Sequence, residues 1–160
     1  YSILPLYLIR ERGIDFNFAN TLFGISRVGG VFVSVFIGFL IDRYGYRFML
    51  MFCLATTGLS TIGLALSSTL TMIVVTLVLQ ATLSVGFFPA GFAALSNLTP
   101  LSERSMAIGM AVSIGMIFGN GGAPVFLGFI ADHFSFHEGI ICLGVLTPLS
   151  SLAVRLLRKE

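Results

Sequence analysis

The sequence predicts an all-α, multi-pass membrane protein, and three observations support this prediction. Hydrophobic residues make up 56% of the 160 residues, whereas charged residues make up only 10%. The charges lie in short clusters, and the apolar stretches between them are close to the ~20 residues that a helix needs to cross a bilayer. Because hydrocarbon offers backbone amides no hydrogen-bond partner, each of these stretches must be helical.

Five complete spanning helices are expected along the chain. The first apolar stretch ends at the charged turn 42–47, and the fourth ends at the polar turn 132–138. The five stretches are 18–41, 48–66, 70–94, 106–131 and 139–154. Residues 1–9 are apolar but too short to cross a bilayer alone. We therefore expect them to be the end of a sixth helix, and the chain to be a piece of a longer protein.

The distribution of Lys and Arg predicts the orientation. If the helices alternate in direction, Arg10 and Arg12 lie on one side of the membrane, and the remaining loop and terminal cations lie on the other: Arg43, Arg47, Arg104, Arg155, Arg158 and Lys159. Cytoplasmic loops carry an excess of Lys and Arg. We therefore expect the C-terminus in the cytoplasm and the protein in the plasma or inner membrane of a cell.

Residues 35–47 and 125–137 resemble each other when the chain is shifted by ninety positions. Val, Phe, Gly, Phe and Asp coincide in the two segments. One segment ends on the inner side of the expected topology and the other on the outer side. This arrangement is typical of an inverted repeat of three plus three helices. Chance similarity between two helix ends rich in Phe and Gly is the alternative.

Arg27 lies near the middle of the stretch 18–41, where a guanidinium costs ~3 kcal/mol even on the most lenient insertion scale. At 100° per residue it shares a face with polar and small side chains, opposite a face for lipid. The first face holds Asn20, Arg27, Gly30, Ser34 and Gly38, and the lipid face holds Leu22, Ile25, Phe32, Phe36 and Leu40. We expect Arg27 to face a cavity or a bound anion; a structural pairing with a carboxylate elsewhere in the protein is the alternative.

Two further polar side chains lie inside apolar stretches and are candidate solute contacts. Gln80 shares a stripe of the third helix with other polar and small residues, and interhelical hydrogen bonding is its alternative role. Asn120 lies in the segment 119–124, where Gly and Pro weaken the helix, and interrupted helices often border transporter sites. The same helix carries a small residue at every fourth position, which predicts close packing of a neighbouring helix: Ala107, Ala111, Gly115, Gly119 and Ala123.

The turn after the first full helix resembles the cytoplasmic signature of the major facilitator superfamily, Gly-x-x-x-Asp-Arg/Lys-x-Gly-Arg/Lys-Arg/Lys. Tyr46 departs from it, and the matching residues are Gly38, Asp42, Arg43, Gly45 and Arg47. The resemblance implies a half-transporter domain over residues 1–160, with a partial helix seven and helices eight to twelve of a C-terminal six-helix bundle. It also implies an N-terminal half of the same chain as partner, and a role for the signature in conformational switching.

The charges of the signature suggest how such a switch could work. Asp42 and Arg43 lie where a helix end meets water, so they can pair with neighbouring helix ends in one conformation and be hydrated in another. Gly38 and Gly45 are expected to let backbones approach closely. A loop that serves only the membrane topology is the alternative.

The expected function is transport of a small solute by alternating access, with Arg27, Gln80 and Asn120 as substrate-binding residues. Arg27 favours an organic anion, because guanidinium binds carboxylate and phosphate well. A multidrug exporter and a non-transporting membrane receptor are the alternatives. The sequence predicts no enzyme, cofactor, metal site or nucleic-acid partner, and we interpret His133 and His137 as ordinary loop residues.

Overall fold

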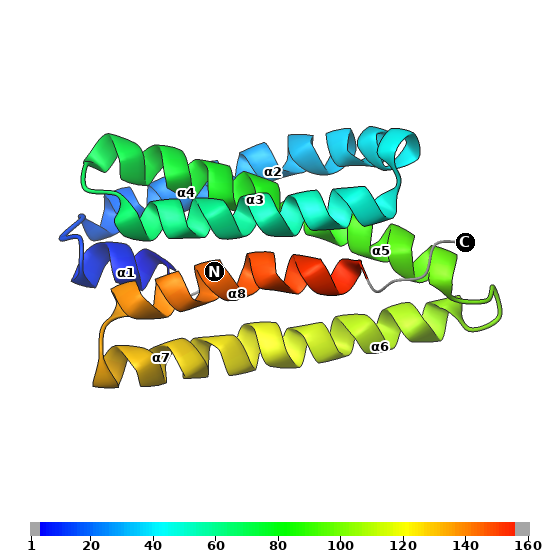
Figure 1. The fold of residues 1–160 in the computed structure, drawn as a ribbon. Helices are drawn as coiled ribbons and strands as arrows, with labels where there is room; N and C mark the ends of the chain where they lie inside the picture. Colours follow the sequence, from blue (N-terminus) through cyan, green and yellow to red (C-terminus); the bar gives the residue numbers. More distant parts are fainter. Residues whose placement is uncertain (1–3, 156–160) are drawn as a thin grey trace.

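The computed structural model describes residues 4–155, and its regular structure within that range is entirely helical (Figure 1). The start of the expected segment 1–9 and the basic residues Arg158 and Lys159 lie outside the described residues. The elements are α1 (Leu4–Arg10), α2 (Phe16–Tyr44), α3 (Tyr46–Leu66), α4 (Leu70–Val85), α5 (Phe87–Leu98), α6 (Arg104–Met116), η1 (Ile117–Gly122), α7 (Ala123–His133) and α8 (Phe136–Val154).

Five helical spans are long and apolar enough to cross a membrane, which confirms the predicted all-α class. They are Phe16–Tyr44, Tyr46–Leu66, Leu70–Leu98, Arg104–His133 and Phe136–Val154. Each span contains one of the stretches expected from the sequence and extends it by a few residues at one or both ends. The extensions bring charged or polar residues into the terminal turns, where water can reach them.

Helix ends are fixed by local hydrogen bonds. The side chain of Asp15 accepts from the backbone N–H groups of Asn17 and Phe18 and begins α2. Thr69 begins α4 and Ser135 begins α8 in the same way. Such caps satisfy amides that lack an intrahelical partner. Between α2 and α3 the chain reverses at Gly45, whose φ of 82° is strained for any residue with a Cβ.

Two of the five spans are irregular. The third is divided into α4 and α5 at Gly86, three residues before Pro89. A Cβ at Gly86 would collide with Ile37 of α2, and it would lie 3.1 Å from Cys53 Sγ of α3, so the division coincides with a close approach of three helices. In the fourth span, η1 is a π-helical turn that contains the segment Gly119–Asn120–Gly121–Gly122.

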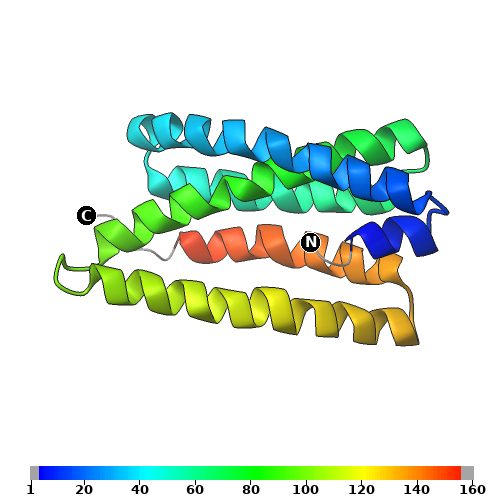
Figure 2. The same cartoon turned by 180° about the vertical axis from the view of Figure 1, so that it is seen from behind.

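The spans form one bundle with α3 near its centre. α3 packs closely against α8, α4 and α5, whereas α2 packs mainly against α4. Figures 1 and 2 show that the α2–α3 turn, the α5–α6 loop and the end of α8 lie at one end of the bundle, which we name the signature end. The turns α1–α2, α3–α4 and α7–α8 lie at the other end, which we name the opposite end.

The two segments of the internal repeat therefore occupy equivalent but inverted places. Residues 35–47 end α2 and begin α3 at the signature end, and residues 125–137 end α7 and begin α8 at the opposite end (Figure 1). Each segment places its aspartate, Asp42 or Asp132, in the last turn of the first helix. This arrangement supports the inverted repeat predicted from the sequence.

Candidate functional site

Arg27 lies on an exposed face of α2, and its guanidinium stacks on an aromatic ring. The Cζ atom is 4.9 Å from the centroid of Phe23, one turn earlier on the same helix. A cation over a ring face is attracted by the ring quadrupole. The stacking positions the charge along the helix surface, beside the seam between α2 and α4.

The packing of α2 differs in part from the predicted division of this helix into a polar face and a lipid face. The buried residues of α2 are Ala19, Leu22, Ser26, Gly30 and Ile37. Leu22, which we expected to face lipid, is therefore buried. Cβ atoms at Gly29 and Gly30 would lie 2.9 Å from Thr82 Oγ1 and 2.7 Å from Val85 Cγ2, so α2 and α4 approach closely there. The small residues of the predicted polar face thus serve packing in part, whereas Ile25, Phe32 and Phe36 are exposed as expected.

Gln80 lies inside the bundle, on the buried stripe of α4. Its side chain is 9% exposed, and its Oε1 atom is buried without a hydrogen-bond partner in the part of the chain that the structure describes. A buried acceptor without a donor costs about 1–3 kcal/mol. The hydroxyl of Thr82, on the face of α4 that meets α2, is in the same condition. Gln80 therefore offers an acceptor to any donor that enters between the helices.

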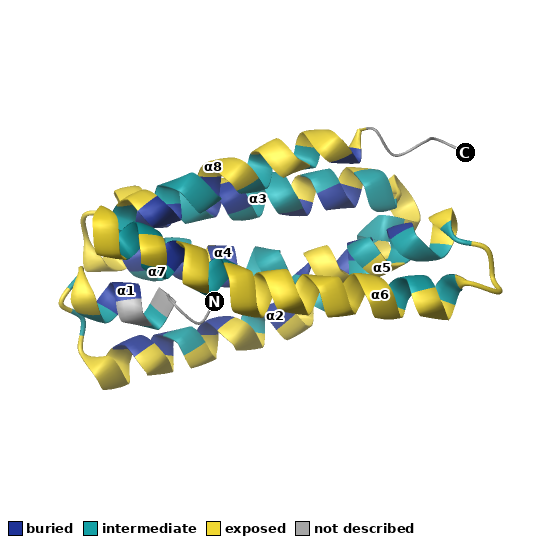
Figure 3. Ribbon diagram, turned by 90° about the horizontal axis from the view of Figure 1, so that it is seen from below, coloured by how far each residue is buried: buried dark blue, intermediate teal, exposed yellow. Residues whose placement is uncertain are grey.

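Asn120 is exposed on η1, and the structure does not bring it to Arg27 or Gln80. The span Arg104–His133 contacts the rest of the bundle mainly through α5 near its start and α8 near its end. Figure 3 shows its long exposed surface. Within the described residues no neighbouring helix packs on two members of its small-residue stripe, because no atom would lie within 4 Å of a Cβ at Gly115 or Gly119.

The signature turn contacts the end of α8. Arg47 Nη2 donates to the backbone oxygen of Arg155, which is the C-terminal cap of α8, at 2.9 Å. A cation is favourable at a helix C-terminus. Asp42 and Arg43 are exposed, and the Arg43 guanidinium lies 5.6 Å from the Tyr44 ring centroid.

The two glycines of the signature do not serve the close approach that we expected. A Cβ at either Gly38 or Gly45 would have no atom within 4 Å among the described residues. Gly45 is instead required by its backbone conformation, and its N–H donates to Ile41 O at 2.8 Å as α2 ends.

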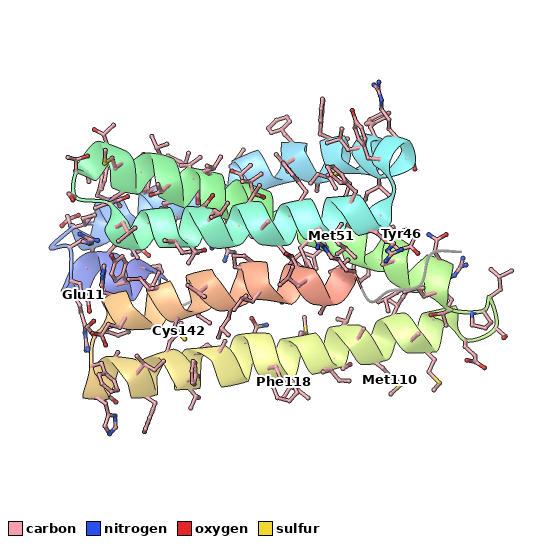
Figure 4. All side chains as sticks on the ribbon, viewed as in Figure 1. Glu11, Tyr46, Met51, Met110, Phe118 and Cys142 are labelled. Atoms are coloured by element: carbon pink, nitrogen blue, oxygen red, sulfur yellow. The ribbon has the colours of Figure 1, made fainter. Side chains whose placement is uncertain are left out.

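Sequence reasoning missed a second polar contact, at the opposite end. Arg12 donates from Nε to the Tyr7 hydroxyl at 2.8 Å and from Nη2 to Ala65 O, near the end of α3, at 2.6 Å. Glu11, labelled in Figure 4, accepts from the N–H of Phe136, the first residue of α8, at 2.6 Å. The α1–α2 turn therefore places a cation at one helix C-terminus and an anion at one helix N-terminus, both favourable.

The polar turn between α7 and α8 shows ordinary local contacts. His133 Nδ1 is 2.9 Å from Phe129 O, and its ring lies 4.3 Å from the Phe129 ring. Among the described residues, no group of three or more His, Cys, Asp or Glu side chains is placed to hold a metal ion.

Five membrane-length apolar helices in one bundle define an integral multi-pass membrane protein. The family model of the Major Facilitator Superfamily matches residues 1–160, and the chain belongs to this superfamily. It is 27% identical over 119 residues to an uncharacterized MFS-type transporter of Bacillus subtilis, YqjV, an alignment that covers 72% of this chain and 29% of the relative. It is 32% identical over 127 residues to the vesicular acetylcholine transporter unc-17 of Caenorhabditis elegans, covering 75% of this chain and 24% of the relative.

The chain thus matches about a quarter of the length of these curated relatives. No solved structure matches it significantly. The family and the names of both relatives are those of transporters, not of enzymes.

Proposed function

We propose that the protein containing this chain moves a small solute across a membrane by alternating access, and that this chain is its C-terminal six-helix half. The family membership carries the proposal. An N-terminal half of the same chain would face this bundle, and solute would bind between the two. The excess of Arg at the signature end supports a cytoplasmic C-terminus, in the plasma or inner membrane.

A small organic anion is the solute that Arg27 supports best. Within the described spans, carboxylates occur only in terminal turns, at Asp42, Asp132 and Glu138, so none lies at the depth of Arg27. Ionisable residues within the membrane usually face a cavity or a partner. Arg27 would bind the anionic group, while Gln80 Oε1 and the amide of Asn120 would contact neutral groups of the solute.

An organic cation is the second candidate, because one relative is named for the transport of acetylcholine. Arg27 would then be structural, held over Phe23, and aromatic rings would contact the solute. Phe87 and Phe88 are exposed at the break between α4 and α5, with their centroids 6.2 Å apart. Such rings can hold a quaternary ammonium by cation–π attraction.

Transport by the full-length protein in proteoliposomes separates these candidates. Uptake of organic anions and of organic cations is measured for wild type, Arg27→Gln, Arg27→Lys and a matched Arg10→Gln control. The anion proposal predicts a loss of at least about tenfold in anion uptake for Arg27→Gln, partial recovery for Arg27→Lys and no change for Arg10→Gln.

Three outcomes would overturn parts of the proposal. Wild-type anion uptake by Arg27→Gln would reject Arg27 as the anion site. Uptake of cations alone would favour the second candidate. Solute binding without flux would indicate a receptor that uses the transporter fold.

A further inference from the structure

A cavity of about 430 Å³ lies at the signature end, between the start of α3 and the end of α8. Its lining residues are Tyr44, Gly45, Tyr46, Arg47, Phe48, Met51 and Arg155. Tyr44 is the last residue of α2, and none of the lining residues comes from α4, α5 or α6. The cavity therefore lies beside the α2–α3 turn and the end of α8. Figure 4 labels Tyr46 and Met51 at this end of α3.

The charge of this cavity is positive among the described residues. Two arginines, Arg47 and Arg155, line it, and no described carboxylate does. Arg47 donates one N–H to the backbone oxygen of Arg155, and its other N–H groups can donate to a bound anion. The guanidinium of Arg155 has no hydrogen-bond or ion-pair partner within residues 4–155. Two like charges in one cavity repel each other, and an anion bound between them would offset this repulsion.

Exposed aromatic side chains extend from the cavity, beginning at the last residue of α2 and continuing along α3. Tyr44 and Phe48 have ring centroids 5.9 Å apart, and Phe48 and Phe52 follow at 6.3 Å with nearly parallel rings. All three are exposed, by 54%, 51% and 42%. Tyrosine is enriched where headgroups meet hydrocarbon. The row of rings therefore runs from the charged end of the helix toward the membrane interior.

We propose that this cavity binds an anionic phospholipid, with its phosphate between Arg47 and Arg155 and one acyl chain along Tyr44, Phe48 and Phe52. Guanidinium binds phosphate through paired hydrogen bonds, and basic pockets between membrane helices hold lipid headgroups. The row of rings favours a lipid over free phosphate, because a soluble anion would leave it unused. The proposed lipid site does not depend on which solute the protein transports. If the C-terminus is cytoplasmic, as proposed above, the lipid belongs to the inner leaflet.

Native mass spectrometry of the full-length protein, titrated with phosphatidylglycerol or phosphatidylcholine, tests the proposal. Phosphatidylglycerol is expected to bind more tightly. Arg155→Gln and Arg47→Gln should each weaken it about fivefold, the factor for one juxtamembrane cation. Arg43→Gln is the matched control, because Arg43 is exposed at the same end but does not line the cavity, and it should change binding little. Phe52→Ala should weaken lipid binding but not the binding of glycerol 3-phosphate.

The other outcomes would overturn the proposal. If the Arg47→Gln/Arg155→Gln double variant binds phosphatidylglycerol with wild-type affinity, the cavity is not the lipid site. An equal loss in Arg43→Gln would indicate attraction to the whole basic surface. If glycerol 3-phosphate competes at the same concentration as the lipid and Phe52→Ala has no effect, the cavity holds a soluble phosphate instead. The melting temperatures of all variants show whether a variant that loses lipid binding has also lost its fold. The test measures lipid binding alone, so it does not depend on whether the protein transports an anion or a cation.

Discussion

The α3–α8 pair and the span Arg104–His133 use glycine in opposite ways. In the pair, a Cβ at Gly58 would collide with the ring of Pro148 and lie 2.9 Å from Gly144 O. A Cβ at Gly144 would lie 3.1 Å from the backbone nitrogen of Ile62. In the long span, glycines such as Gly109, Gly115 and Gly121 have no atom of residues 4–155 within 4 Å of the Cβ position. Glycine therefore permits backbone contact between helices in one region, whereas in the other the described residues make no such contact.

This difference indicates which part of the bundle is fixed and which can change shape. Polar contacts hold both ends of the α3–α8 pair, through Arg47 at the signature end and through Glu11 and Arg12 at the opposite end. The long span contains a π-helical turn, a feature that often marks functional segments of helices. We therefore expect the pair to act as the scaffold and the long span to rearrange during transport.

Replacing the glycine at the helix contact should have the largest effect. Gly144→Leu would place its side chain against the backbone of α3, which cannot move aside as a flexible side chain can, and should destabilise the fold by about 3 kcal/mol or more. Gly115→Leu should change stability by less than about 1 kcal/mol. Thermal melting of the full-length protein in detergent measures both. Equal losses would mean that another part of the protein packs as tightly on the long span as α8 packs on α3.

Removing the cation of the α1–α2 turn should have the next largest effect. Arg12→Gln loses the charged hydrogen bonds to Tyr7 and Ala65, and should cost about 2 kcal/mol. Arg10→Gln is the control, because Arg10 is exposed in the last turn of α1 and should lose only about 0.5 kcal/mol of interaction with the helix dipole. Melting of the full-length variants provides the comparison. If the two variants melt alike, the contacts of Arg12 do not stabilise the α3 end.

The sequence predicted the helices well because hydrophobicity and charge act locally. Apolar stretches bounded by charged or polar residues predicted the five spans, and their ends differ from the prediction only in the terminal turns. The division of the third span at Gly86 and the π-helical turn of the fourth are departures inside a span. The contacts between helices were not predictable in the same way. Gly58 and Gly144 are single glycines in apolar stretches, and nothing local identifies each as the partner of the other. The spacing of small residues around Gly115 showed that close packing is possible there, but not whether a neighbouring helix makes use of it.

The candidate site was predicted by residue type and not by arrangement. Arg27 is unusual at any place in an apolar helix, so a single sequence reveals it. Arg12 was overlooked because the carbonyl that it contacts, on Ala65, is 53 residues away in the sequence. A backbone carbonyl at a helix end has no sequence signal of its own. The contact between Arg47 and the backbone oxygen of Arg155 was not predicted for the same reason, because the two residues are 108 positions apart in the sequence.

Regularising the π-helical turn should have a smaller effect on stability than on transport. Gly121→Ala adds helix propensity of about 1 kcal/mol without a collision, so it should raise the melting temperature. It should also slow transport, if η1 must change shape. Gly109→Ala is the control in the regular helix α6, and should raise the melting temperature without slowing transport. If both variants transport at the same rate, η1 does not need to change shape during transport.

Removing only the charge of Glu11 should have the smallest effect. Glu11→Gln keeps an acceptor for the N–H of Phe136 but loses the anion at the start of α8, which should cost about 0.5 kcal/mol, and less at high salt. Glu11→Ala loses the hydrogen bond as well, and should cost about 1–2 kcal/mol. Melting at low and high salt separates the two terms. If Glu11→Gln is as damaging as Glu11→Ala and salt has no influence, the geometry of the carboxylate, and not its charge, holds the turn against the α3–α8 pair.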